Sequence, residues 1–301
     1  MKVLVVGVDL DTFVMEQCNA LKKAGVNVFT HKVTGHGPTG YLKEIFKLQR
    51  AIKQIHPDLI HAHYGLSGLC ANFQRKVPVV TTYHGSDIHS GGWVLKLSRL
   101  AMRLSSYNIF VSEQLYRQSE YDKKNACIIS CGIDLDTIQP VDRKKAKEGI
   151  GKTHTFVLFA SSFSNNVKNP ELAKKSMSLL PQTELVELKG YNREEVNLLM
   201  NAADCLLVTS HREGGPLVVK EAMACGTPIV SVDVGDVKNV IGDTAGCYIA
   251  ERNPEDIARK IKLALNFKEK TRGRQRIVNL GLDNDDIAKK IIEVYQQCLR
   301  Q

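Results

Sequence analysis

The sequence lacks any long hydrophobic run. Its first apolar stretch spans only residues 3–7 and is followed by Asp9 and Asp11, which suits a buried strand and is too short for a signal peptide. No other segment approaches about 18 uninterrupted apolar residues, the length that a membrane-spanning helix needs. These absences argue against a membrane-spanning protein, and we expect a cytoplasmic one.

Paired cysteine motifs are also missing. The chain has eight cysteines, but none forms a C-x-x-C pair or a zinc-ligand spacing. Most of them fall in apolar stretches, namely Cys18, Cys70, Cys127, Cys205 and Cys247. We therefore expect buried free thiols in a reducing compartment.

A charged tail is absent as well. The formal net charge is +9, with 16 basic and 11 acidic residues in 1–140, and 25 and 21 in 141–301. Because the excess is spread evenly, it does not indicate a nucleic-acid-binding segment. It suits a protein that handles phosphorylated ligands or contacts an anionic membrane, or one with a mildly basic solvated surface.

Short apolar runs alternate with amphipathic stretches along the chain, which is typical of parallel sheets covered on both faces. The first half predicts strands at 3–7, 26–30, 59–62, 77–83, 106–111 and 126–129, and helices at 12–24, 41–56 and 93–104. After a charge-rich connection at 139–152, strands are predicted at 156–160, 185–188, 205–208 and 229–232, and helices at 170–180, 194–203, 254–267 and 283–299. The fold class is therefore α/β, with two doubly wound parallel-sheet domains facing a central cleft.

The most informative stretch is residues 205–232. Two apolar runs flank a short helical segment that Gly214-Gly215-Pro216 opens and Cys225-Gly226-Thr227-Pro228 closes. Glu213 and Glu221 lie on either side of the helix start, where the unpaired amides of a helix attract anions. One reason for two carboxylates there is that they bind hydroxyl groups of a ligand whose phosphate lies nearby.

This stretch resembles the donor-binding signature of glycosyltransferase family 4, which has the GT-B fold. The two glutamates have seven residues between them, and the second begins the run Glu-Ala-Met-Ala-Cys-Gly-Thr-Pro. The resemblance implies a retaining glycosyltransferase that moves a hexose-type sugar from a nucleotide-diphosphate sugar to a glycan or lipid-linked acceptor, in surface polysaccharide or glycolipid synthesis. It assigns 1–140 to the acceptor side, 141–282 to the donor, and 283–301 to a helix that packs back on the N-terminal domain.

The resemblance also assigns the donor-binding residues. Lys168, directly before a predicted helix, is the expected diphosphate ligand, but the family's Arg six residues earlier is Ser162 here. Either the Ser/Asn-rich loop replaces that Arg or Arg212 takes part of its charge. No Asp-x-Asp motif lies at a suitable place, since Asp9/Asp11 falls in the first loop and Asp134/Asp136 in the interdomain turn, so we expect neither a metal nor another cofactor.

Glu213 is expected to contact the donor sugar near the reaction centre, and Glu221 to accept hydrogen bonds from the ribose diol. Gly214 and Gly215 would let the backbone approach the ligand closely. The remaining donor-site positions are Gly190 and Leu217, and Pro216 removes one amide that many relatives keep.

On the acceptor side, His84 matches the family's His-Gly-x-Asp stretch and is expected to bind the donor sugar during catalysis. Asp87 is either a partner of the acceptor hydroxyl or an N-cap. His61 and His63 share one face of a strand; without a third ligand they are acceptor-site or structural residues rather than a metal pair. Both predicted helices 41–56 and 93–104 combine apolar and basic residues, which suits either contact with an anionic membrane or ordinary cover of the sheet.

No dedicated nucleophile stands out, so we expect front-side attack in which the leaving phosphate accepts the acceptor's proton. Two alternatives stay open: a non-catalytic nucleotide-sugar-binding partner of another transferase, which Ser162 supports, and a GT-B sugar-nucleotide epimerase.

Overall fold

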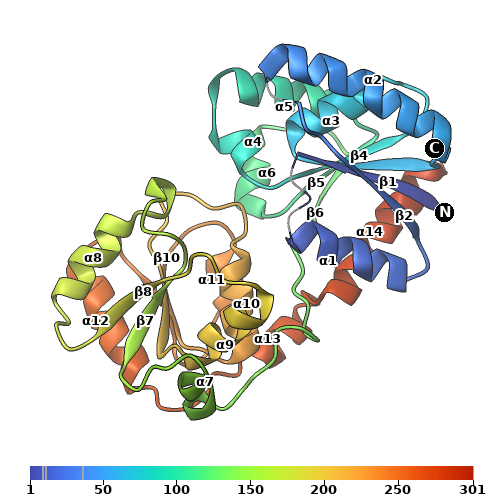
Figure 1. Cartoon of the computed structure of the whole chain (residues 1–301). Helices are drawn as coiled ribbons and strands as arrows, with labels where there is room; N and C mark the ends of the chain where they lie inside the picture. Colours follow the sequence, from blue (N-terminus) through green and yellow to red (C-terminus); the bar gives the residue numbers. More distant parts are fainter. Residues whose placement is uncertain (9, 11, 36, 301) are drawn as a thin grey trace. The chain divides into compact units, whose positions relative to one another are not determined.

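The computed structural model describes residues 1–8, 10, 12–35 and 37–300. The chain forms two compact units, Met1–Gly132 with Asn284–Gln301 and Ile133–Asp283, and each is built on one parallel sheet (Figure 1). The predicted α/β class with two parallel-sheet domains is confirmed. The Asp9/Asp11 pair lies outside the described residues.

The first unit contains a six-stranded sheet in the order β2-β1-β3-β4-β5-β6. The strands are β1 (Lys2–Gly7), β2 (Asn27–Lys32), β3 (Leu59–His63), β4 (Val79–Tyr83), β5 (Tyr107–Phe110) and β6 (Ala126–Ile128). β3 and β4 are buried along their whole length, and β3 is unusual among buried strands in carrying two histidines, His61 and His63. The chain order reverses between β1 and β3, the kind of position where open α/β sheets bind ligands at the carboxyl ends of their strands.

Seven helices are described in the first unit. They are α1 (Thr12–Lys23), α2 (Gly37–Ile55), α3 (Gly65–Asn72), α4 (Ser86–His89), α5 (Gly92–Leu104), α6 (Glu113–Ser119) and α14 (Asn284–Leu299). In Figure 1, α2, α3 and α5 cover one face of the sheet, and α1 and α14 cover the other. The chain's last helix therefore completes the first unit, with Tyr295 fully buried and Asp285 2.7 Å from the ammonium of Lys23.

The second unit contains a five-stranded sheet in the order β11-β10-β9-β7-β8. The strands are β7 (Phe156–Phe159), β8 (Glu184–Glu187), β9 (Cys205–Val208), β10 (Ile229–Val232) and β11 (Cys247–Ala250). The helices are α7 (Arg143–Gly149), α8 (Pro170–Ser178), α9 (Arg193–Ala202), α10 (Leu217–Cys225), α11 (Val237–Ile241), α12 (Pro254–Asn266) and α13 (Gly273–Asn279), with a 3-10 turn at Asn166–Lys168. β7, β9 and β10, which are fully buried, form the centre of this unit.

Candidate functional site

The loops after β7 and β9 bring Lys168 and Glu213 together in the second unit. Lys168 ends the 3-10 turn just before α8, and Glu213 lies between β9 and α10. The Lys168 ammonium lies 2.7 Å from Glu213 Oε1, and the Ser210 hydroxyl donates to the same oxygen at 2.6 Å. The Thr209 hydroxyl lies 2.9 Å from the carbonyl oxygens of Lys168 and Asn169, which fastens the two loops to each other.

Glu221 is paired with an arginine that the sequence did not single out. It is 5% exposed within α10, and Oε1 of its carboxylate accepts a hydrogen bond from the Arg193 guanidinium. Arg193 is the first residue of α9, where Asn192 and Glu195 form a capping box. That capping pattern could have located the start of α9, and with it Arg193, from the sequence. The pairing with Glu221 could not be predicted in this way, because it joins residues 28 positions apart. We call Lys168, Arg193, Ser210, Glu213 and Glu221 the glutamate site.

Ser162, at the position of the family's Arg, is directed to a different carboxylate. Its hydroxyl donates to Glu187 Oε2 at 3.2 Å, and the Phe163 amide donates to the same oxygen at 2.6 Å. These hydrogen bonds, that of the Phe163 amide first, lower the pKa of the Glu187 carboxyl. The arginine of the glutamate site is instead Arg193, which belongs to α9.

The glycines beside Glu213 pack closely against the segment that contains Gly235 and Asp236. A Cβ added to Gly215 would lie 3.2 Å from Asp236 Oδ2, and that carboxylate is 3.2 Å from the ammonium of the fully buried Lys220. Gly214 contributes the carbonyl oxygen that would lie 3.2 Å from a Cβ on Gly235. The glycines thus permit close packing of this loop against the segment before α11.

The other predicted donor positions lie at the edges of this region. Leu217 is the first residue of α10, with Pro216 in the capping position. Gly190 follows β8 with a φ of +79°, and an added Cβ would meet open space. Arg212 is exposed on the loop that carries Glu213.

In the first unit, three histidines gather at the ends of β3 and β4, and we call His61, His63 and His84 the histidine cluster. The rings of His61 and His63 stack at 4.5 Å between centroids, and those of His63 and His84 at 5.2 Å. His63 Nδ1 lies 2.9 Å from His84 Nε2, so one ring donates and the other accepts.

Neighbouring side chains contact both ends of this cluster. His61 Nδ1 contacts the Tyr295 hydroxyl at 2.6 Å and its Nε2 contacts Thr82 Oγ1 at 2.7 Å, while His84 Nδ1 lies 3.8 Å from Cys131 Sγ. Burial lowers the pKa of all three rings, that of His63 to about 4. The cluster is therefore neutral at pH 7. Across the described residues, His63 Nε2 is buried without a hydrogen-bond partner.

Asp87 closes the turn that follows His84. The capping position of α4 is Gly85, so the N-cap interpretation of Asp87 is wrong: its carboxylate instead accepts hydrogen bonds from the amides of Gly85 at 2.9 Å and His84 at 3.3 Å. Burial raises the pKa of this carboxyl to about 6. Asp87 also lines a cavity of about 310 Å³, together with Val8, Tyr64, Leu66, Ser86, Ser90 and Val94.

A second cavity, of about 270 Å³, lies between α2, α3 and α5, and we call it the apolar groove. It is lined by Gly37, Tyr41, Leu42, Ile45, Leu66, Leu69, Cys70, Phe73, Trp93 and Leu97. Trp93 is 63% exposed and Leu42 58% exposed, although both are large and apolar. Exposed lysines stand beside them, Lys43 on α2 and Lys96 on α5.

Two features are absent from the described residues. No group of three or more His, Cys, Asp or Glu side chains is placed to hold a metal ion. In the same part of the chain, no helix combines the length and apolar character needed to cross a bilayer.

Comparison with known proteins gives the same class for both units. The profile "Glycosyltransferase Family 4" matches residues 7–137, and "Glycosyl transferases group 1" matches residues 182–278. An uncharacterized glycosyltransferase of Methanocaldococcus jannaschii is 26% identical over 83% of this chain and 76% of its own length. A D-inositol 3-phosphate glycosyltransferase of Geodermatophilus obscurus is also 26% identical, over 71% of this chain and 60% of its own length.

Solved structures share the fold over nearly the whole chain. Sucrose-phosphate synthase from Thermosynechococcus elongatus superposes with a TM-score of 0.87 at 18% identity, covering 99% of this chain and 98% of that one. Anabaena HepE in complex with UDP and glucose gives 0.78 at 19% identity, covering 98% and 99%. The matches to both units support a family 4 glycosyltransferase, and the chain has the GT-B fold.

Proposed function

We propose that the protein transfers a hexose-type sugar, with retention of configuration, from a nucleotide-diphosphate sugar to a hydroxyl of a glycan or lipid-linked acceptor. The observation that carries this proposal is the glutamate site, where Lys168 pairs with Glu213 and Arg193 with Glu221. Cations suit a diphosphate and carboxylates suit sugar hydroxyls. HepE, whose solved complex contains UDP and glucose, supports a nucleotide-sugar donor.

Donor binding would exchange the partners within each pair. The diphosphate takes Lys168, and the Glu213 carboxylate then accepts a hydrogen bond from a hydroxyl of the sugar. Glu221, turned from Arg193, accepts from the ribose diol, which leaves the guanidinium for the phosphates. Since the site supplies its own cations, the transfer proceeds without a metal or another cofactor.

For the chemical step we propose front-side attack. The acceptor oxygen bonds to the anomeric carbon while the bond between that carbon and the diphosphate oxygen breaks. A phosphate oxygen of the leaving diphosphate takes the acceptor's proton. Lys168 stabilises the charge that develops on the diphosphate. The catalytic role that the family resemblance gives His84 stays a prediction.

The donor can be identified by a thermal-shift screen across nucleotide-diphosphate sugars, because a ligand that binds only the folded state raises the unfolding temperature. Transfer of radiolabelled sugar from the best donor then separates a transferase from a non-catalytic binder and from an epimerase. A donor that stabilises the protein but is neither transferred nor hydrolysed would contradict the proposed activity.

We also propose that the protein is cytoplasmic and that the apolar groove and its lysines contact the inner face of an anionic membrane. Lipid-linked acceptors of surface polysaccharides or glycolipids are found there. A relative in Bacillus subtilis that is named for teichuronic acid biosynthesis supports such a role. Vesicles with anionic lipid should co-sediment the protein more than neutral vesicles, and Trp93→Glu should remove the difference. Leu179→Glu, at a 47% exposed position of the second unit, is the matched control, and equal binding to both vesicles would reject the contact.

A further inference from the structure

A pocket of about 350 Å³ lies near the amino ends of the strands in the second unit's sheet, and we call it the basic pocket. It is lined by Pro140, Val141, Asp142, Arg143, Lys268 and Lys270. Asp204, which faces Arg143, directly precedes β9, so the pocket belongs to the amino ends of the strands. The glutamate site follows the carboxyl ends of the same strands, and the two sites are separate.

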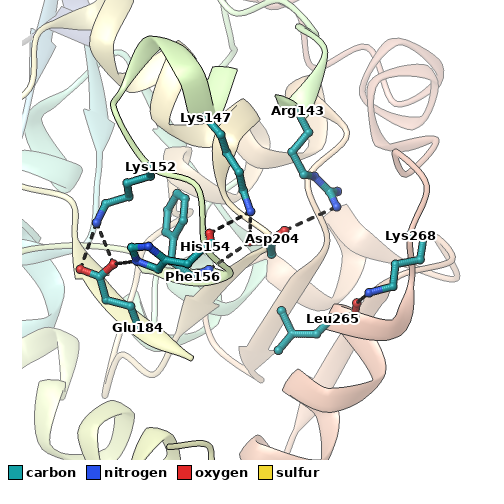
Figure 2. A network of polar contacts seen from close by, with 9 residues as sticks. All are labelled: Arg143, Lys147, Lys152, His154, Phe156, Glu184, Asp204, Leu265 and Lys268. Carbon is teal, nitrogen blue, oxygen red and sulfur yellow. Dashed lines mark hydrogen bonds and ion pairs between the residues drawn. The ribbon is translucent and has the colours of Figure 1, made fainter. Parts of the chain in front are cut away.

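In the polar network drawn around Arg143, two lysines are neutralised by carboxylates. Figure 2 shows Lys147 directed at Asp204, with Nζ 2.7 Å from Oδ2, and Lys152 directed at Glu184, again at 2.7 Å. The Phe156 amide also donates to Asp204 Oδ2 at 3.0 Å. The carboxylates of this network are therefore already engaged by close partners.

Arg143, by contrast, is only loosely paired. Its Nη1 lies 3.8 Å from Asp204 Oδ1, which is longer than a hydrogen bond (Figure 2). Within the described residues its Nε is buried and has no hydrogen-bond partner. A guanidinium offers five N–H donors in a fixed plane, so this side chain keeps donors available for a ligand.

The two lysines of the pocket contact only neutral oxygens. Lys268 Nζ donates to the carbonyl oxygen of Leu265 at 3.1 Å, and Lys270 Nζ donates to Asn201 Oδ1 at 2.6 Å and to the Cys225 carbonyl oxygen at 2.8 Å. Burial first, and also the charge of Arg143, lower the pKa of Lys270 to about 8. An anion placed between Arg143 and Lys270 would offset both effects, because an opposite charge favours the protonated lysine.

We propose that the basic pocket binds the phosphate group of a small soluble phosphomonoester. The pocket lining carries three basic side chains, Arg143, Lys268 and Lys270, and one carboxylate, that of Asp142. Because the nearby Asp204 is paired with Lys147, two positive charges remain for a dianion. The donors come from α7 and from the segment after α12, so they approach a tetrahedral group from different directions. The volume leaves room for a small organic group beside the phosphate.

Inorganic phosphate tests the site by calorimetry at constant ionic strength. Arg143→Gln combined with Lys268→Gln should weaken phosphate binding about tenfold or more, because two charge-assisted contacts are lost. Lys144→Gln, which removes the neighbouring charge of α7 outside the pocket, should leave the dissociation constant unchanged. Lys168→Gln should also leave it unchanged, since that lysine belongs to the glutamate site.

Unchanged binding by the double variant, loss of binding in Lys168→Gln, or no heat from phosphate with the unaltered protein would overturn the proposal. Should the double variant fail to fold, Lys268→Gln alone serves, because that exposed side chain contacts only one carbonyl oxygen. Competition by glycerol 3-phosphate supports the soluble ligand. Competition only by vesicles containing phosphatidic acid would overturn that choice in favour of a lipid headgroup.

Discussion

At the scale of single residues, the two glutamates are set apart by their partners. Glu213 receives Lys168 and Ser210, whereas Glu221 receives Arg193 from a different helix. Both residues are at least partly buried, so each charge gains more from its partner than an exposed pair would. The separate partners predict separate kinetic roles.

Glu221→Ala should raise KM for the donor about 10- to 100-fold with little change in kcat, because it removes ground-state contacts to the ribose. Glu213→Ala should instead lower kcat about 100-fold, as expected for contacts near the reacting carbon. Steady-state kinetics with the identified donor measures both, with Glu194→Ala on the exposed face of α9 as control. Identical kinetics in the two variants would reject these roles.

The histidine cluster predicts how stability depends on pH. The folded pKa of His63 lies near 4, below its unfolded value near 6.5, so the unfolded chain binds more protons between these values and stability falls as pH falls. Asp87 has a folded pKa near 6 and an unfolded value of 3.8, so its contribution to stability increases as pH falls from 6 to 3.8. Each shift is worth about 3 kcal/mol, so these two nearly cancel and the lowered pKa values of His61 and His84 decide the sign.

The unfolding temperature should therefore decrease between pH 7 and pH 5. His63→Asn keeps an amide near the position of Nδ1 without a titrating ring, and it should make this decrease shallower. Thermal unfolding followed by circular dichroism at several pH values provides the measurement. Equal slopes for both proteins would contradict the assignment.

At the scale of elements, the buried strands could be predicted because they read as apolar runs, whereas α3 and β11 could not. α3 (Gly65–Asn72) contains two glycines, which disfavour an isolated helix. A Cβ on Gly65 would lie 2.3 Å from Ser98 Oγ and 3.0 Å from Ser98 Cα, and one on Gly68 would meet Thr81 at 2.6 Å. Tertiary packing against α5 and β4 thus accounts for the glycines that weaken the local signal.

Gly65→Ala should destabilise the protein by about 1–3 kcal/mol, because the added methyl group would lie 2.6 Å from Cβ and 3.0 Å from Cα of Ser98 on α5. Gly149→Ala is the matched control: its Cβ would meet only the end of the Leu198 side chain at 3.0 Å, and alanine favours a helix over glycine. Urea unfolding of both variants gives the comparison. A Gly65→Ala protein as stable as the control would contradict the packing argument.

At the scale of the molecule, the last helix joins the far end of the chain to the first unit. α14 buries Ile287, Ile291, Val294 and Tyr295, and the Tyr295 hydroxyl contacts His61 across 234 positions of sequence. Since these side chains belong to the first unit's core, that unit depends on the final 18 residues.

Removal of residues 284–301 should unfold the first unit while the second stays folded, because each has its own sheet and core. Limited proteolysis with mass spectrometry should then find cleavage throughout residues 1–132. Tyr295→Phe is the milder companion and should cost about 1–3 kcal/mol by leaving His61 Nδ1 without its partner. A truncated protein with intact resistance in the first unit would show that α14 is dispensable.

The sequence by itself determined the two parallel α/β halves, the placing of Lys168 and Glu213 between a strand and a helix, and the placing of Glu221 in the helix that follows Glu213. It could do so because buried parallel strands and helix starts leave local patterns of apolar, capping and glycine residues. Only the tertiary structure decided which charges meet: Arg193 with Glu221, His61 with Tyr295, and Arg143 facing the lysines of the basic pocket. These contacts join separate elements of the chain, and no local pattern of residues records which side chains the folded sheets bring together.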